Sequence, residues 1–296
     1  MKLLNRLFGR REKEAAPEYA PQPEVWQAAP EEEAPGGEPV FLAGNIQGLG
    51  SREAQEDSFA VRNSADPEQL ESRGLFAVVA DGMGGMAAGK EASQCAVDVL
   101  LERFDQWEAE PAAPEWLYAG ACAASDQVYR RFGGQSGTTL TAVYVVQDHL
   151  YWLSVGDSAI YLMRDGGVFQ LNREHTYLNR LYQQELEAGT LDKGRAETDP
   201  DARRLTSFVG IDHLQEVDLN LRPLALQPGD VILLCSDGIS GVLTPPELME
   251  AMSLDPAEGC GLLETMILEK QIPEQDNYTG VMIAWRTPKG PSAGRL

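Results

Sequence analysis

Three apolar runs in this 296-residue chain are each followed by an aspartate. The run LFAVVA leads directly into Asp81, whereas VILLC and LYWLSV reach Asp237 and Asp157 one residue later. For any single run, an ordinary Asp-Gly turn after a strand is the simpler explanation. Three such runs together suggest that the strands deliver carboxylates to a shared place.

Further acids, Glu56, Asp57 and Asp276, lie in turns beside other predicted strands. Gathered without a counter-charge, such carboxylates would repel one another and resist burial. Gathered around divalent cations they become ligands, and oxygen ligation without His or Cys selects Mg²⁺ or Mn²⁺. Two such ions about 3.5–4 Å apart can activate water and polarise a phosphoryl oxygen. This acid set therefore favours phosphate ester hydrolysis.

The elements that must position these acids can be predicted from hydrophobic spacing. Apolar residues at helical spacing predict helices over 89–107 and 114–132, and polar residues 173–209 form an excursion with a helix near 176–188. Thr244 is a candidate N-cap before Pro245 for another helix. A helix is also expected within 261–271, and strands at 40–47, 57–63, 75–80, 138–147, 149–156, 158–166, 168–172, within 217–235 and at 280–287.

The order of these elements indicates how they are layered. Helices come in pairs between runs of strands, which fits antiparallel sheets better than alternating strands and helices. The sequence Asp165-Gly166-Gly167 predicts a tight hairpin between two of the strands. We therefore expect an α+β fold.

Composition excludes some classes of function. A net charge of −22 would repel DNA or RNA, so we expect no nucleic-acid partner. None of the four cysteines forms a C-x-x-C pair, and Cys95, Cys122 and Cys235 lie in apolar surroundings typical of small core residues. This usage fits the reducing cytoplasm. We find no apolar run of the ~20 residues that a membrane helix needs.

The N-terminal region differs from the rest of the chain. Residues 1–14 are basic and could form a short amphipathic helix that touches an anionic membrane or an acidic partner. We favour a solvated, disordered end, because so short a helix is marginal in water. Residues 15–39 are rich in Pro, Ala and Glu and are predicted to be an extended linker.

Six motifs occur along the chain in a familiar order: GSREAQEDSF, VVADGMGG, SGTTLTAVYV, LYWLSVGDSAIYL, VILLCSDGISGVL and DNYTGVMIAW. In this order they resemble the motifs of the metal-dependent serine/threonine protein phosphatases, the PPM or type 2C family, in its bacterial form. The resemblance covers about residues 41–286. It implies a four-layer α-β-β-α sandwich, with two antiparallel sheets flanked by helix pairs, and it identifies residues 173–209 as the flap beside the cleft.

The resemblance also implies roles for individual residues. Asp81 is similar to the residue that bridges two metal ions, and Gly82 to one that offers its backbone carbonyl. Asp237 and Asp276 resemble the remaining carboxylate ligands of the metal pair. Two Mn²⁺ or Mg²⁺ ions are the implied cofactors.

Four further positions match the family around this pair. Glu56 and Asp57 match its first acidic pair, and Arg52 precedes them at the spacing of the phosphate-binding arginine, whose planar fork suits a phosphate. Asp157 resembles an aspartate that, with Asp237, holds a third and weaker metal ion. Arg52, Asp57 and Asp81 are thus the expected catalytic residues.

The chain departs from the family at several positions. Met83 stands where animal members carry His, Ala159 where many have Arg, Glu174 where Asp is usual, and Ser207 where Arg is common. These departures bear on the proton donor, the third metal and the flap more than on the metal pair. His149 and His213 are expected at the surface, and His175 is expected to order the flap rather than to act in catalysis.

We therefore expect a bacterial phosphatase domain over residues 40–287, followed by a flexible tail over 288–296. A water activated by metal would attack phosphoserine or phosphothreonine in proteins. The enzyme would act as a cytoplasmic monomer against a Ser/Thr kinase. Two alternatives remain: a catalytically silent member that binds phosphoproteins as a regulatory scaffold, and a switch that is activated through the flap or the basic N-terminus.

Overall fold

The computed structural model describes the chain from residue 40 to residue 286, apart from three short gaps. The predictions of a disordered end, a linker and a C-terminal tail fall outside the described residues. The described ranges are 40–83, 88–108, 112–190 and 192–286.

One antiparallel sheet contains the two ends of the described region. Its strand order is β1-β11-β10-β6-β7, so the first and last strands are neighbours. Strand β11 pairs with β1 on one side and β10 on the other. The strands are β1 (Val40–Gly48), β6 (Ala159–Arg164), β7 (Gly167–Gln170), β10 (Val231–Cys235) and β11 (Tyr278–Arg286).

The second sheet is also antiparallel and lies against the first. Its order is β2-β3-β4-β5-β8, and a short β9 also pairs with β5. An apolar cluster that includes Val79, Leu150, Ile232 and Ile283 fills the space between the sheets. The strands are β2 (Ser58–Arg62), β3 (Leu75–Ala80), β4 (Leu140–Val146), β5 (His149–Val155), β8 (Asp218–Leu219) and β9 (Leu224–Ala225).

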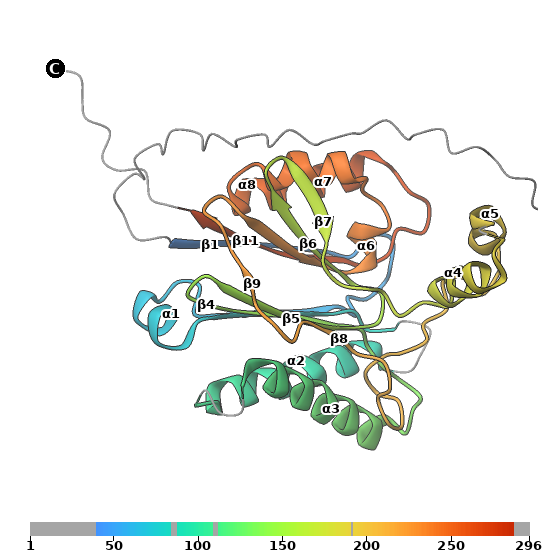
Figure 1. The fold of residues 1–296 in the computed structure, drawn as a ribbon, viewed down its shortest axis with the longest axis horizontal. Coiled ribbons are helices and arrows are strands. Elements are labelled where there is room, and N and C mark those ends of the chain that lie inside the picture. Colours follow the sequence, from blue (N-terminus) through green and yellow to red (C-terminus); the bar gives the residue numbers. More distant parts are fainter. Residues whose placement is uncertain (1–39, 84–87, 109–111, 191, 287–296) are drawn as a thin grey trace, which may run out of the picture. The chain divides into compact units, whose positions relative to one another are not determined.

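Helix pairs cover the outer faces of both sheets, as Figure 1 shows. Helices α2 (Gly89–Gln106) and α3 (Ala113–Phe132) pack on the second sheet around an aromatic cluster that includes Phe76, Phe104 and Trp116. Helices α7 (Pro245–Met252) and α8 (Pro256–Glu269) pack on the first. The predicted four-layer sandwich is confirmed.

Local chemistry explains why these segments fold as they do. All six residues of β3 are buried, as expected for a strand covered on both faces. Asp165 and Gly166 adopt φ of 51° and 72°, which a two-residue hairpin with the twist of its strands requires. The backbone N–H of Thr244 donates to the carboxylate of Glu247 at 2.7 Å, and this bond fixes the start of α7.

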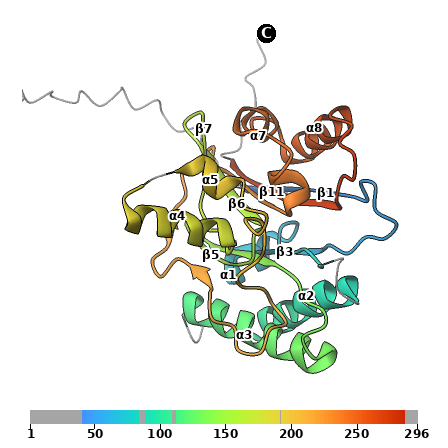
Figure 2. The same ribbon diagram turned by 90° about the vertical axis from the view of Figure 1, so that its right-hand side faces the viewer.

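The flap projects from one end of the sandwich. It contains α4 (Tyr177–Ala188) and α5 (Lys193–Glu197), which Figure 2 shows in front of the ends of the strands. The helix predicted near residues 176–188 is thus confirmed, whereas α5 was not predicted. Another short helix, α1 (Pro67–Arg73), was also missed, and α6 (Asp237–Ser240) begins at one of the predicted site residues. Within the described ranges, every helix lacks the length or the apolar character that a membrane span would need.

Candidate active site

The two sheets each bring acids to the same edge of the sandwich. Asp57 precedes β2, while Asp81 and Asp157 follow β3 and β5 of the second sheet. From the first sheet, Asp237 follows β10 and Asp276 precedes β11. Since the sheets pack face to face, the predicted acid set lies across their interface.

Side chains of the second sheet fix the backbone of Asp81. Its N–H donates to Oγ1 of Thr139 at 3.0 Å, and its carbonyl accepts from the N–H of Thr139 at 2.9 Å and from Oγ1 of Thr138 at 2.8 Å. Thr139 Oγ1 in turn lies 2.7 Å from Oγ of Ser158. The end of β3 is therefore held in place on both sides of the peptide.

Hydrogen bonds across the sheets hold Asp57. Oδ2 of Asp57 accepts from Oγ of Ser236 at 3.0 Å, next to Asp237 in the chain. The N–H of Glu56 donates to Oδ1 of Asn277 at 2.8 Å, next to Asp276. Asp57 is fully buried, and its Oδ1 has no hydrogen-bond partner among the described residues.

Two glycines allow the loops of the site to approach closely. A Cβ on Gly82 would lie 2.4 Å from the carbonyl oxygen of Gly89 and 2.5 Å from that of Glu56. A Cβ on Gly238 would lie 1.9 Å from the carbonyl oxygen of Asn277. This close packing explains why Asp81 and Asp237 are each followed by glycine.

Burial and mutual repulsion make the central acids reluctant to ionise. Burial raises the pKa of Asp57 to about 6, with the charge of Asp237 adding to the rise. Burial raises the pKa of Asp81 well above its usual range, and the charges of Asp57, Asp237, Asp157 and Asp276 raise it further. The hydrogen bond from Ser236 opposes the rise at Asp57.

The acids nearer the flap show the same effect. Burial, followed by the charges of Asp237 and Glu174, raises the pKa of Asp157 to about 7. The carboxylate of Asp237 is open to the cleft, yet the surrounding protein raises its pKa, as does the charge of Asp276, while that of Arg203 lowers it. Such a set of perturbed carboxylates in a cleft is typical of a functional site.

The predicted phosphate-binding residue lies beside a predicted metal ligand. Nη2 of Arg52 donates to Oδ2 of Asp276 at 2.7 Å, and both side chains are partly exposed. Glu56 lies nearby, where burial raises its pKa and the charge of Arg52 opposes that rise. The sequence placed these residues in one site but did not predict that Arg52 and Asp276 would pair.

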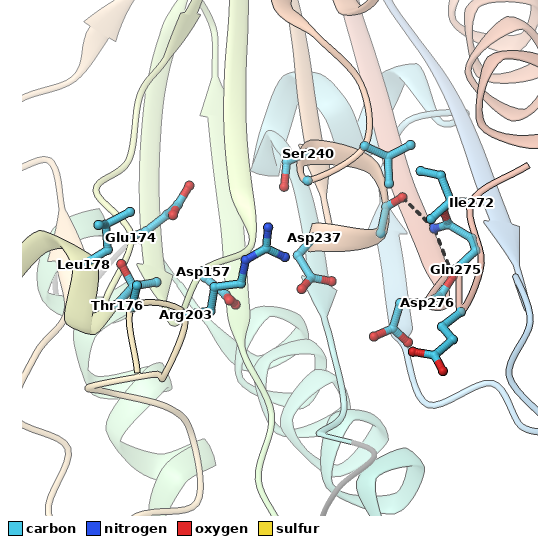
Figure 3. A pocket seen from close by; sticks show the side chains of 15 residues that line it. Asp157, Glu174, Thr176, Leu178, Arg203, Asp237, Ser240, Ile272, Gln275 and Asp276 are labelled. Carbon is cyan, nitrogen blue, oxygen red and sulfur yellow. Dashed lines mark hydrogen bonds between the residues drawn. The ribbon is translucent and has the colours of Figure 1, made fainter. Parts of the chain in front are cut away.

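Two adjoining clefts open over the acid set. The smaller, of about 250 Å³, is lined by Arg52, Asp81, Gly82 and Met83 together with Asp157, Asp237 and Asp276. The larger, of about 570 Å³, shares these last three acids and extends toward the flap (Figure 3). Its walls include Glu174, Leu178, Arg203 and Ile272.

The donor set fits hard divalent cations. Asp57, Asp81, Asp157 and Asp237 form no ion pair within the described residues, and Asp57 Oδ1 is a buried acceptor without a donor. A divalent cation would compensate both the charge and the unsatisfied oxygen. In the described part of the chain, no group of three His, Cys, Asp or Glu side chains is close enough together to hold a metal ion. The acids thus line the cleft without converging on a single position.

His175 ties the base of the flap to the sheet, as the sequence predicted. Its imidazole Nδ1 accepts from the backbone N–H of Gly156 at 3.0 Å, and its backbone N–H donates to the Gly156 carbonyl at 2.8 Å. Burial lowers the pKa of this histidine. The side chains of His149 and His213 are exposed, also as predicted.

The other sequence predictions at the site have mixed outcomes. Cys95, Cys235 and Cys260 are buried, but Cys122 is only half-buried, because it lies toward the edge of the α3 surface that faces the sheet. Sequence reasoning missed Arg203 and Leu205, which the flap brings to the two clefts. No local signal separates Arg203 from the other charged residues of the flap.

Comparisons with known proteins agree with this geometry. The family model for protein phosphatase 2C matches residues 54–275. The serine/threonine phosphatase stp of Listeria innocua is 29% identical over 209 residues, which cover 68% of this chain and 78% of stp. The serine/threonine protein phosphatase PstP of Mycobacterium tuberculosis is 31% identical over 237 residues, or 77% of this chain but only 44% of PstP.

A solved structure that shares the fold contains a metal pair. The crystal structure of the catalytic domain of PstP in complex with two manganese ions superposes with a TM-score of 0.66 and 25% identity, covering 84% of this chain and 99% of that domain. The matched family model spans most of the chain, including every predicted site residue except Arg52 and Asp276. The chain therefore belongs to the protein phosphatase 2C family and is a metal-dependent protein serine/threonine phosphatase.

Proposed function

We propose that Asp57, Asp81, Asp237 and Asp276, with the carbonyl of Gly82, hold two Mn²⁺ or Mg²⁺ ions between the sheets. The observation that carries this proposal is the buried, uncompensated carboxylate set, in which Asp57 Oδ1 has no hydrogen-bond partner among the described residues. Glu56 would contribute to the set directly or through water. When bound, the ions supply Lewis acidity and activate a water molecule for attack on phosphorus.

The residues of the chain itself would then orient the substrate. Arg52 lies at the mouth of the smaller cleft, where its guanidinium can bind two oxygens of a phosphoserine or phosphothreonine. Asp276, its present partner, would turn toward a cation. Direct attack by the activated water would need no covalent enzyme intermediate.

Met83 bears on the source of the proton for the leaving group. It lines the smaller cleft where animal members carry His, and a thioether has no proton to donate. The departing serine or threonine oxygen would therefore take its proton from water or from another acid of the cluster.

We also propose a third, weaker cation site between Asp157 and Asp237. Both acids line the two clefts, and the charge of Asp237 adds to the rise that burial causes in the pKa of Asp157. Ala159 leaves this side of the site without the arginine that many members have, and Glu174 adds a longer carboxylate to the same wall. This site therefore differs most from the family pattern.

The proposed setting follows from the charge and the cysteines. A net charge of −22 disfavours nucleic acid and leaves phosphoproteins as the substrate class. The cysteines are free thiols, which fits a reducing cytoplasm. We propose that the enzyme acts there as a monomer and opposes a Ser/Thr kinase.

The test is hydrolysis of a phosphothreonine peptide with Mn²⁺, Mg²⁺ or EDTA, by the wild type and by Asp81→Asn. Turnover should require a divalent cation and should fall by at least about 100-fold in the variant, since an amide is a weak ligand for a hard cation. Asp126→Asn, on the exposed face of α3, is the matched control and should behave as wild type. A folded wild type without turnover in any metal would contradict the proposal and favour a regulatory binding protein.

A further inference from the structure

Arg203 projects from the flap into the larger cleft. Figure 3 shows its guanidinium reaching from the flap side toward Asp237, with Asp157 beside it. Most of the other charged residues that line the two clefts are acids. Among the described residues, Arg52 and Arg203 are the cations that line them, and they lie in different clefts.

The backbone on both sides of Arg203 is fixed. The carbonyl of Ala202 accepts from the N–H of Leu178, and the carbonyl of Arg204 accepts from the N–H of Tyr177, both at 2.8 Å. These two N–H groups belong to the first turn of α4, where a helix has no partners of its own for them. Ala202 is also buried. The loop therefore holds Arg203 in a defined place at the start of α4.

Among the described residues, none pairs with the guanidinium of Arg203. Elsewhere in the flap, Arg180 pairs with Glu216 at 2.7 Å, Arg195 pairs with Glu185 at 3.6 Å, and Arg204 lies over the ring of Tyr177. In the described part of the chain, no ion pair or hydrogen bond engages Arg203, which is exposed. The charge of Arg203 nevertheless lowers the pKa of Asp237 and so opposes the rise that burial causes there.

We propose that Arg203 is a second substrate-phosphate residue, which binds the phosphoryl group from the flap side while Arg52 binds it from the side of the first acidic loop. This inference rests on the proposed function of the acid set. A phosphate monoester brings about two negative charges into clefts that are lined mainly by carboxylates. A planar guanidinium without a partner is the donor best suited to that group.

The position of Arg52 strengthens the need for a second cation. Arg52 already shares its guanidinium with Asp276, so part of its hydrogen-bonding capacity is directed at a carboxylate. Asp157 and Asp237 line both clefts, so the phosphoryl site adjoins the space that Arg203 enters. Without Arg203, oxygens of the phosphoryl group that point toward the flap would meet no cation among the described residues that line the larger cleft.

The test compares Arg203→Ala and Arg203→Lys with the wild type at saturating Mn²⁺. For Arg203→Ala, KM for a phosphothreonine peptide and the inhibition constant of inorganic phosphate should both rise about tenfold, the effect of losing one charge-assisted contact. The turnover number should change less, because a contact made in both ground and transition states acts on KM. Arg203→Lys should recover part of the loss, and the affinity for Mn²⁺ measured by calorimetry should stay unchanged.

Arg195→Ala is the matched control, because it removes the same charge from the same segment but outside both clefts. Its KM and phosphate inhibition should match the wild type. Unchanged phosphate inhibition in Arg203→Ala would overturn the inference, and a changed Mn²⁺ affinity with unchanged inhibition would show that Arg203 only balances the charge of Asp237. If the wild type itself fails to turn over, the proposed function fails, and calorimetric binding of inorganic phosphate to the two Mn²⁺-loaded proteins still decides the role of Arg203.

Discussion

Replacing Asp157 by asparagine should make the metal-free protein more stable at neutral pH. Burial, followed by the charges of Asp237 and Glu174, raises the pKa of Asp157 from 3.8 to about 7. Between these values the folded protein keeps a proton that the unfolded chain has lost. Folding therefore binds a proton, and the free energy of unfolding falls as pH rises through this window.

The size of the effect follows from the two pKa values. A rise from 3.8 to about 7 corresponds to at most about 4 kcal/mol, because one pKa unit is worth 1.36 kcal/mol. Asparagine has nearly the same shape and does not ionise. The variant and the wild type should therefore be equally stable near pH 4, and the variant should gain a few kcal/mol over the wild type by about pH 7.5.

Urea unfolding in EDTA at several pH values between about 4 and 8 measures this difference. Added Mn²⁺ should shrink it, since cations compensate the charge of the acid set. An Asp148→Asn variant changes an exposed aspartate on the same sheet and serves as the control. The reasoning is refuted if the wild type in EDTA becomes more stable from pH 4.5 to 7, or if Asp157→Asn follows the same slope as the wild type.

Two other substitutions test the packing around the site and the ion pair behind it. Gly82→Ala would push a methyl group against the carbonyl of Gly89. We therefore expect a lower melting temperature and at least about tenfold weaker Mn²⁺ binding by calorimetry. Unchanged values of both would show that the loop can accommodate the methyl group. Arg164→Ala leaves the Asp230 carboxylate, which is 2% exposed, without its partner at 2.5 Å. The free energy of unfolding in urea should fall by about 3–5 kcal/mol. A fall below about 1 kcal/mol would mean that water replaces the guanidinium.

Most of the fold could be predicted because its signals are local. A few neighbouring residues suffice to predict the strand β3 from its six apolar residues, the turn at Asp165-Gly166 and the helix start at Thr244. Helix α1 was missed because none of its residues is buried, so it has no apolar periodicity. Its signal lies in the cap, where the side chain of Asp66 accepts from the N–H of Gln69.

The candidate site could be predicted only as a set of residue types. Strand ends and glycines indicated that Asp81 and Asp237 would converge, and both now line the same clefts. The pairing of Arg52 with Asp276 depends on two loops 224 residues apart in the chain, which no local pattern encodes. The position of Arg203 depends on how the flap returns to the first turn of α4, which is likewise a tertiary contact.

The apolar layer between the sheets has a consequence for how the enzyme can be altered from afar. Each sheet carries part of the acid set, so the thickness of the layer that contains Val79 and Ile283 sets the spacing of the carboxylates at its edge. A larger or smaller side chain in this layer would change the distance between the sheets and hence the distances between the carboxylates. Core variation among related enzymes could thereby adjust metal preference while every residue at the cleft stays the same.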